Sequence, residues 1–395
     1  MNDAPRLPPA EKDSLHLGYL RLTDSAPVIM ARELGLYAKY DLDVALQREV
    51  SWANLRDKLV TGALDAAQML APLPLATTLG VGGLRADVIT GLALSLNGNA
   101  ITLSPSLSAA IGEFGGNAEL SARSTAEALG TWLRGRSGAE QLTLATAHSF
   151  SCHTFLLQMW LLAGGIDPQR DVRIIVLPPE QMVDSLTRGS IDGFCVGEPY
   201  NSMAVQYGVG AVQASGYQIW NNGIEKVLGV LASWHQSYPT AHLRLRLALM
   251  ESCAWLADQK NRNEAAAILA MPEYLDTPQE FLAPSLTGRF VYAKGQSPVE
   301  VPDFHVFGRY QAGFPWRSYG DWLLQQTGAL VGKTLSSERV KSLVQQTYRT
   351  DLYREAARHL QLPSPSGDYK PSNQHDTVWE YEPGIELGPD MSLSR

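Results

Sequence analysis

A local pattern that occurs twice, 127 residues apart, constrains the fold more than any other feature of this 395-residue chain. Each copy reads as the end of a helix, a tight turn, a buried strand and the start of the next helix. The matching positions are Gly62 and Gly189, Asp65 and Asp192, and Pro72 and Pro199 (189 − 62 = 192 − 65 = 199 − 72 = 127). Glycine is common at the left-handed position that ends a helix, aspartate is common in turns, and proline is common at the start of a helix. The repeat predicts two similar α/β lobes, although two unrelated βαβ units would share part of the pattern.

Strand-like and helix-like segments alternate from Leu15 onward, which is typical of an α/β protein. The expected strands are 15–20, 42–50, 66–70 and 87–94, and the expected helices are 27–37, 52–61 and one that begins at Pro72. This order predicts parallel connections within the sheet.

The chain is expected to cross between the lobes twice, which would form a hinge. Residues 15–98 and 215–362 would form the first lobe and residues 99–214 the second. Hinged lobes place a small ligand in the cleft between them. Helices that would buttress the first lobe are expected at 240–260, 263–270, 277–286 and 337–362.

The two ends of the chain are expected to lie outside the lobes. Residues 1–14 would form an N-terminal extension. Residues 363–395 are rich in Pro, Ser and Gly, so we expect an extended tail that wraps the surface. In that tail, Trp379 and Tyr381 would either clamp the fold or contact a partner.

Charge and composition narrow the classes of partner. The chain has 32 Lys and Arg against 40 Asp and Glu, a formal net charge of -8 at pH 7, whereas nucleic acids attract basic surfaces. No apolar stretch reaches the roughly 18 to 20 residues that span a bilayer, and the N-terminal MNDAPRLPPAEKD lacks the apolar core of a secretory signal. Three cysteines without metal-ligand spacing predict reduced thiols. We therefore expect a cytoplasmic protein without direct nucleic-acid binding and without membrane insertion.

No motif of an enzyme class is found. The chain lacks the GxxxxGKS/T and GxGxxG nucleotide loops, the GxSxG elbow, and the HExxH and HxExxC zinc patterns. We expect a binding protein rather than an enzyme, with no cofactor and no bound metal ion.

Two candidate ligand residues fall at predicted helix starts. His153 lies in the first turn of a helix that follows a polar loop containing His148, where unpaired N–H groups and the helix dipole favour an anion. Trp52 follows Ser51, a candidate N-cap, and its indole N–H is a hydrogen-bond donor. The alternatives are that His153 only caps or packs and that Trp52 only fills the core.

Two further candidates lie near the expected crossings. Lys226 in GIEKVLGV either supplies a point charge for an anion or forms an ordinary surface pair with Glu225. Asn99 in NGNAIT lies at the first crossing, from which an amide side chain can face either lobe.

Six runs of the sequence resemble the nitrate and bicarbonate solute-binding family of ABC transporters, and the resemblance extends over residues 15–360. They are GYLRLTDSAP (18–27), REVSWANLRDKLVTGALDAAQMLAPLP (48–74), NGNAITLS (97–104), WLLAGGIDPQRDVRIIVLPPEQMV (160–183), IDGFCVGEPYN (191–201) and EKVLGV (225–230). The resemblance implies an α/β, two-lobed, periplasmic-binding-protein-like (type II) fold with a hinge and an interlobe cleft.

The same resemblance implies a nitrate pocket made of a tryptophan, an amide, a histidine and a lysine. These fall here on Trp52, Asn99, His153 and Lys226. In nitrate-binding relatives the amide is commonly glutamine, and Asn99 is one methylene shorter. Bicarbonate-binding relatives carry an acidic residue in place of Lys226 and use a calcium ion beside the anion. Lys226 therefore favours nitrate or nitrite without a metal ion.

The lack of a visible export signal is similar to the cytoplasmic nitrate/nitrite sensors of this family, the NasS type. This likeness implies a sensor that controls a NasT-like antiterminator, an RNA-binding regulator, through ligand-driven lobe closure. The alternative is the solute-binding component of a nitrate ABC transporter. The fold also resembles pyrimidine-precursor synthases of thiamine biosynthesis, whose cysteine cluster this chain lacks. A binder of sulfonates or other organic anions would need a larger cleft.

Overall fold

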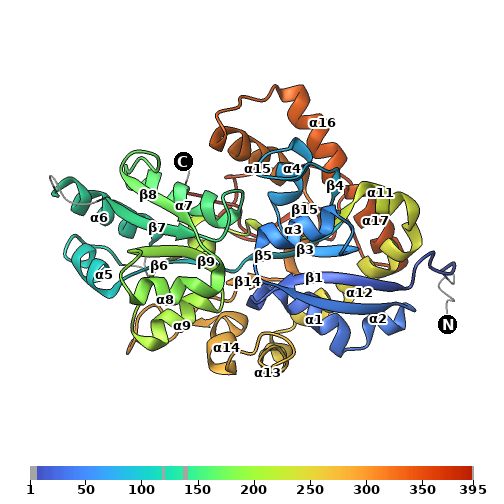
Figure 1. Cartoon of the computed structure of the whole chain (residues 1–395), viewed down its shortest axis with the longest axis horizontal. Helices are drawn as coiled ribbons and strands as arrows, with labels where there is room; N and C mark the ends of the chain where they lie inside the picture. The colour runs from blue at the N-terminus through green and yellow to red at the C-terminus, as the bar shows by residue number, and fades with distance from the viewer. Residues whose placement is uncertain (1–6, 118–120, 137–140, 394–395) are drawn as a thin grey trace.

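The computed structural model describes residues 7–117, 121–136 and 141–393. Two separate sheets, each flanked by helices, lie side by side (Figure 1). We call the part built on the sheet of β1 lobe 1 and the part built on the sheet of β6 lobe 2. The predicted two-lobed α/β fold is confirmed. Residues 1–6 of the expected extension and 394–395 of the expected tail lie outside the described residues. Within the described ranges, no helix is both long enough and apolar enough to cross a bilayer.

Lobe 1 contains a mixed sheet with the strand order β14-β5-β11-β3-β1-β2, and β4 pairs with β11. Its strands are β1 (Ser14–Leu20), β2 (Asp43–Glu49), β3 (Ala66–Leu70), β4 (Val88–Ile89), β5 (Ala93–Asn97), β11 (Ile224–Leu231) and β14 (His305–Val306). β1 runs parallel to β2 and β3, as predicted. β11 is antiparallel to β3 and β5, so the expectation of parallel connections fails there. The reason is that β11 enters the sheet on its return from lobe 2.

Lobe 2 contains a five-stranded sheet with the order β10-β6-β9-β7-β8. Its strands are β6 (Asn99–Leu103), β7 (Leu142–Thr146), β8 (Val172–Val176), β9 (Gly193–Gly197) and β10 (Ala211–Ser215). β7 is parallel to β8 and β9, which repeats the arrangement of β1 with β2 and β3. The helices that precede β11 are α1 (Ala26–Glu33), α2 (Leu36–Lys39), α3 (Trp52–Val60), α4 (Leu73–Leu79), α5 (Pro105–Gly112), α6 (Ala122–Arg134), α7 (Cys152–Ala163), α8 (Met182–Thr187), α9 (Tyr200–Tyr207) and α10 (Gly216–Ile219).

The repeated sequence pattern forms the same local structure in both lobes. Gly62 and Gly189 have φ angles of +78° and +68°, the left-handed conformation predicted for the helix ends. Pro72 and Pro199 stand at the N-caps of α4 and α9, as predicted.

The two repeated aspartates make equivalent hydrogen bonds. Asp65 Oδ2 accepts the His16 N–H at 2.9 Å, and Asp192 Oδ2 accepts the Thr143 N–H at 2.8 Å. His16 and Thr143 also lie 127 residues apart (143 − 16). Each aspartate therefore connects the turn before a strand, β3 or β9, to the parallel neighbour of that strand, which is β1 or β7.

The two crossings between the lobes are bonded to each other. β5 ends at Asn97 and β6 begins at Asn99, so Gly98 alone separates a strand of lobe 1 from a strand of lobe 2. The Asn97 N–H donates to the carbonyl oxygen of Gly223 on the return crossing, at 2.9 Å. Gly98 has a φ of +94°, and a Cβ there would lie 2.4 Å from the His305 ring. We propose the lobe boundaries at residues 98/99 and after β10, which continues to Ser215 rather than ending at the expected residue 214.

One backbone pairing explains two differences from the expected elements. The expected strand 87–94 is divided into β4 and β5, and the expected helix 337–362 is divided into α16 (Ser337–Thr347) and α17 (Thr350–His359). The Thr90 N–H donates to Thr347 O, and the Arg349 N–H donates to Thr90 O, both at 2.8 Å. Because these backbone groups pair with each other, neither segment continues its own strand or helix.

Segments after β11 contact both lobes rather than lobe 1 alone. They include α11 (Ala232–Ser237), α12 (Pro239–Ala257), α13 (Arg262–Leu269), α14 (Gln279–Thr287), β12 (Arg289–Phe290), β13 (Val299–Glu300) and α15 (Arg317–Leu330). α14 packs on α9 of lobe 2, where the Phe281 and Tyr207 rings lie 5.3 Å apart. The Val212 N–H in β10 donates to Tyr292 O at 2.7 Å. The expectation that these helices buttress the first lobe did not include this contact of α14 with lobe 2.

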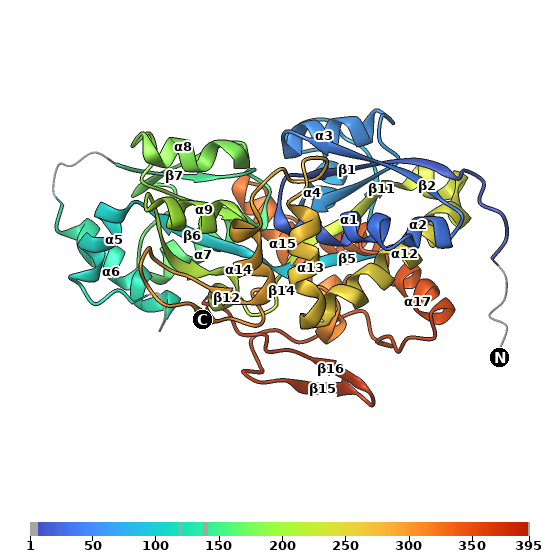
Figure 2. The ribbon, with the colours of Figure 1, turned by 90° about the horizontal axis from the view of Figure 1, so that it is seen from below.

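The C-terminal segment runs along the outside of the molecule and forms a two-stranded hairpin of β15 (Trp379–Glu382) and β16 (Ile385–Leu387), which lies below the two lobes in Figure 2. At its start, the Asp368 carboxylate accepts hydrogen bonds from Arg317, Thr350 and Arg354. Near its end, the Leu393 N–H donates to Ile219 O at 2.9 Å, beside the return crossing.

The shared aspartate contact generates a stability prediction. In an Asp192→Ala variant the Thr143 N–H loses its acceptor, so the free energy of unfolding should fall by about 1 to 2 kcal/mol. Asp184→Ala is the control, because Asp184 is 60% exposed and pairs with the exposed Arg188; it should change stability by less than about 0.5 kcal/mol. Urea unfolding followed by tryptophan fluorescence measures both values. Equal effects in the two variants would contradict the structural role of the repeat.

Candidate functional site

The four predicted ligand residues lie at the junction of the two lobes. Trp52 begins α3 and Lys226 lies in β11, both in lobe 1. Asn99 begins β6 and His153 lies in the first turn of α7, both in lobe 2. None of the four side chains exposes any surface. Contacts through Glu225 and the indole ring, described below, connect all four.

Capped helix starts position Trp52 and His153. The Asn54 N–H donates to Ser51 Oγ at 3.2 Å, which confirms the predicted N-cap of α3. In lobe 2 the Thr154 N–H donates to Ser151 Oγ at 3.1 Å and fixes the start of α7. Both caps satisfy N–H groups that would otherwise be unpaired at a helix start.

An irregularity in β11 brings the side chains of Glu225 and Lys226 together. The pairing of β11 with β5 shifts register between Ile224 and Lys226. Successive side chains of a regular strand point to opposite faces, and a bulge redirects them. Here Glu225 Oε1 lies 2.7 Å from Lys226 Nζ. Both residues are at most 1% exposed, so the alternative of an ordinary surface pair is wrong.

A second carboxylate contacts Lys226 from the loop after β1. Asp24 Oδ2 lies 2.8 Å from Lys226 Nζ, and the Gln68 amide holds Asp24 by donating to its Oδ1 at 2.9 Å. Burial would by itself lower the pKa of Lys226, but the Asp24 and Glu225 carboxylates outweigh it and raise that pKa above its ordinary value. Lys226 is therefore an ammonium ion, and its Nζ also lies 5.4 Å from the centre of the Trp52 ring.

The Glu225 carboxylate contacts lobe 2 as well as lobe 1. Its Oε2 accepts from Asn99 Nδ2 at 2.5 Å, and its Oε1 lies 3.3 Å from His153 Nε2. Burial raises the pKa of Glu225 and the Asp24 charge adds to the rise, whereas Lys226 and Asn99 oppose it. Burial and the Lys226 charge hold the pKa of His153 well below its ordinary value, so the imidazole is neutral.

Several buried polar atoms at this junction have no hydrogen-bond partner among the residues that the structure describes. They include Trp52 Nε1, Ser95 Oγ, Asn99 Oδ1 and both ring nitrogens of His153. A buried polar group without a partner is costly and rare in folded proteins. Unpartnered donors from both lobes are the arrangement expected where a small polar molecule binds.

Two residues of this cluster were not among the predicted site residues. Glu225 was considered only as a surface partner of Lys226, and Asp24 only as part of the run GYLRLTDSAP. The available signal was two adjacent charges, Glu225 and Lys226, within an otherwise apolar strand. Asp24 gave no such signal, because its contact with Lys226 joins positions 202 residues apart (226 − 24).

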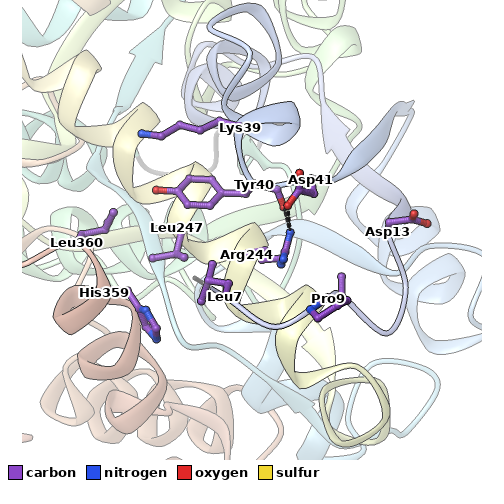
Figure 3. A pocket seen from close by; sticks show the side chains of 11 residues that line it. Leu7, Pro9, Asp13, Lys39, Tyr40, Asp41, Arg244, Leu247, His359 and Leu360 are labelled. Carbon is purple, nitrogen blue, oxygen red and sulfur yellow. Dashed lines mark hydrogen bonds and ion pairs between the residues drawn. The ribbon is translucent and has the colours of Figure 1, made fainter. Parts of the chain in front are cut away.

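A cavity of about 880 Å³ lies elsewhere, between the N-terminal segment and α12 at the outer end of lobe 1 (Figure 3). Arg244 lines this cavity, and its guanidinium group donates to Asp41 Oδ2 at 2.6 Å, Tyr40 O at 2.7 Å and Pro8 O at 2.8 Å. No residue of lobe 2 is among those that line this cavity, so a ligand bound there would not connect the two lobes.

Glu198 is a further buried acid close to the junction. It follows β9, and its carbonyl oxygen accepts the Thr23 N–H of lobe 1 at 2.8 Å. Its Oε2 accepts the Ser202 N–H at 3.1 Å, while its Oε1 is unpartnered within the described chain. Burial raises the pKa of Glu198 to about 7.

Comparison with known proteins identifies a family model and several relatives that are similar to this chain in sequence. The NMT1-like family model matches residues 8–270. The nitrate import ATP-binding protein NrtC of Synechocystis sp. is 38% identical over 361 residues, 91% of this chain and 52% of NrtC. The bicarbonate transport ATP-binding protein CmpC of Synechococcus elongatus is 35% identical over 354 residues, 89% of this chain and 50% of CmpC. The nitrate/nitrite binding protein NrtA of Synechocystis sp. is 30% identical over 393 residues, 96% of this chain and 83% of NrtA.

The extent of these matches differs between the relatives. The chain spans about half the length of NrtC and CmpC but most of the length of NrtA. The crystal structure of the periplasmic nitrate-binding protein NrtA from Synechocystis PCC 6803 superposes with a TM-score of 0.84 at 29% sequence identity, covering 97% of each chain. The fold of this chain is thus similar to that of a nitrate-binding protein over nearly its whole length.

The buried Glu198 generates a prediction about stability and pH. The unfolded glutamate releases its proton near pH 4.5 and the folded one near pH 7, so stability should fall as pH rises through this window. A pKa difference of this size corresponds to a loss on the order of 3 kcal/mol, which a Glu198→Gln variant should not show. Urea unfolding at pH 5 and pH 8 measures the difference. Glu180→Gln is the control, since Glu180 is 46% exposed and should leave the pH dependence unchanged; the same dependence in Glu198→Gln as in the wild type would refute the assignment.

Proposed function

The chain belongs to the nitrate and bicarbonate solute-binding family of ABC transporters, and from this premise we propose that it binds nitrate or nitrite between its two lobes. The observation that carries the proposal is the buried cluster of Trp52, Asn99, His153 and Lys226 at the lobe junction, where donors from both lobes have no partner among the described residues. Nitrate and nitrite are small anions that accept hydrogen bonds, and such anions leave water only where donors replace it.

Each proposed contact has a distinct physical role. Lys226 supplies positive charge, while the Trp52 indole N–H and the neutral His153 supply uncharged donors. The Asn99 amide completes the ring of donors. Because Trp52 and Lys226 belong to lobe 1 and Asn99 and His153 to lobe 2, an anion held by all four would connect the lobes.

The surroundings of Lys226 favour nitrate or nitrite over bicarbonate. By the family resemblance, bicarbonate-binding relatives carry an acidic residue at this position and use a calcium ion. Here the Lys226 ammonium lies between Asp24 and Glu225, at 2.8 Å and 2.7 Å from their oxygens, in the place that a cation between these carboxylates would take. We therefore propose binding without a metal ion or other cofactor.

We propose that the protein acts as a cytoplasmic sensor, like the NasS-type members that its sequence resembles. Closure of the lobes on the anion would control a NasT-like antiterminator, which would be released when the anion binds. A ligand can shift this equilibrium only by its difference in affinity for the open and closed forms. The four contacts drawn from two lobes support such a difference, since an open form would separate them.

The second candidate is the solute-binding component of a nitrate ABC transporter, and the names of the relatives favour it. NrtA is described as a periplasmic nitrate-binding protein, and NrtC as a nitrate import ATP-binding protein. Fractionation of cells that express the full-length gene separates the two candidates, because a transporter component would be found in the periplasm. Because the names of these relatives describe the binding and transport of nitrate, we propose a binding role and no enzymatic activity for this chain.

The first test of the proposed function is isothermal titration with nitrate, nitrite and bicarbonate. A Trp52→Phe variant keeps the aromatic ring and removes the indole N–H, so nitrate or nitrite should bind about tenfold more weakly, as for one lost hydrogen bond to a charged group. Trp132→Phe, in α6 of lobe 2, is the matched control with unchanged affinity. Heat from none of the three anions would reject the proposed ligands and favour a larger organic anion such as a sulfonate.

The second test concerns the partner. The immobilised protein should retain a NasT-like antiterminator without anion and release it at saturating nitrate or nitrite, because closure changes the surface that the partner contacts. Trp52→Phe should require a correspondingly higher anion concentration for release. Retention of the complex at saturating nitrate and nitrite, with binding shown by titration, would reject release as the mode of control.

A further inference from the structure

We propose that the Glu225 carboxylate is an internal occupant of the anion site and that an incoming anion must displace it. The proposal rests on the proposed function, since the donors concerned are those assigned to nitrate or nitrite. It adds a specificity-determining residue of this chain to the four contacts already described.

The contacts of Glu225 carry the argument. Its two oxygens face three of the four proposed anion contacts: Lys226 Nζ at 2.7 Å, Asn99 Nδ2 at 2.5 Å and His153 Nε2 at 3.3 Å. A side chain of lobe 1 therefore occupies the Asn99 donor of lobe 2 and lies beside the His153 ring. The carboxylate is itself a planar, delocalised anion of single charge, so it resembles nitrate and nitrite in shape and in hydrogen-bonding capacity.

The charge of the cluster makes simultaneous occupation unfavourable. Asp24 and Glu225 face one ammonium group, that of Lys226, and all three side chains are buried. With both carboxylates ionised the group carries one net negative charge, and a bound anion would add a second. Repulsion between buried like charges is strong because little solvent screens it. An anion can use these donors favourably only when Glu225 has left them.

Asp24 does not share this role, although it also contacts Lys226. Its second oxygen accepts from Gln68 Nε2 at 2.9 Å, which is a contact within lobe 1. It makes no hydrogen bond to Asn99 or His153. Asp24 therefore holds Lys226 from within lobe 1, whereas Glu225 contacts both Lys226 and the Asn99 donor of lobe 2.

Displacement has a consequence for affinity. When a side chain of the protein occupies an anion-binding site most of the time, an added anion can bind only while the site is free. The apparent affinity for the anion is then the intrinsic affinity multiplied by the fraction of molecules in which the site is free. Removal of the Glu225 carboxylate should therefore strengthen anion binding, whereas removal of an ordinary binding residue weakens it. This opposite sign distinguishes an internal occupant from a ligand contact.

The test combines two variants and two anions. In Glu225→Ala, formate, which matches the missing carboxylate, should bind and raise the melting temperature, whereas it should leave the wild type unchanged. Nitrate should bind Glu225→Ala and the isosteric Glu225→Gln at least about tenfold more tightly than the wild type. Asp24→Asn is the comparison variant, because it also removes a carboxylate from Lys226 but leaves Glu225 in place, and it should gain no formate binding.

Each outcome decides between the proposals. Unchanged or weaker nitrate binding in Glu225→Gln, with the wild type binding nitrate, would overturn the internal occupant and leave the proposed function standing. If Glu225→Ala binds formate but neither the wild type nor any variant binds nitrate, the proposal that Glu225 occupies the site is supported and the proposed function is rejected. Formate binding that appears equally in Asp24→Asn would attribute the effect to charge alone and would also overturn the proposal. If Glu225→Ala does not fold, Glu225→Gln decides alone.

Discussion

The buried ammonium group of Lys226 is the interaction on which the junction of the two lobes depends. A charge without exposed surface persists in a folded protein only when opposite charges or donors and acceptors surround it. Here the loop after β1 supplies Asp24, the bulge in β11 supplies Glu225, and the Trp52 ring lies beside the ammonium. The loop, the bulge and the helix start must be placed together for the charge to be tolerated, so one cation fixes the geometry of three segments of lobe 1.

Lobe 2 is coupled to this cation indirectly, through Glu225 and its contact with Asn99. Asn99 follows the single residue of the first crossing, so the hydrogen bond lies close to the hinge. A contact near a rotation axis moves little when the lobes open, whereas His153, farther along in α7, belongs to a different element of lobe 2. The cluster thus combines a contact near the hinge with others that depend on closure.

Much of this architecture can be predicted from the sequence, for physical reasons that can be named. The repeat of Gly62, Asp65 and Pro72 fixes helix ends, turns and helix starts by local rules, and the structure reproduces it in the second lobe. The interruption between β4 and β5 escapes prediction, because it depends on Thr90 pairing with a backbone more than 250 residues later (349 − 90 = 259). The position of Glu225 escapes it as well, since a bulge breaks the alternation of side chains on which strand predictions rest.

The outer C-terminal segment gives the hinge a third mechanical element besides the two crossings. It is fixed to lobe 1 at Asp368, pairs with the return crossing through Leu393, and receives a hydrogen bond from Arg123 in α6 of lobe 2. A rotation of the lobes must therefore stretch or displace this segment, which resists the rotation in addition to the two crossings. The stiffness of the joint between the lobes is consequently set in part by residues that belong neither to the buried cluster nor to the sheets of the two lobes, and changes in them can alter how readily the two halves separate.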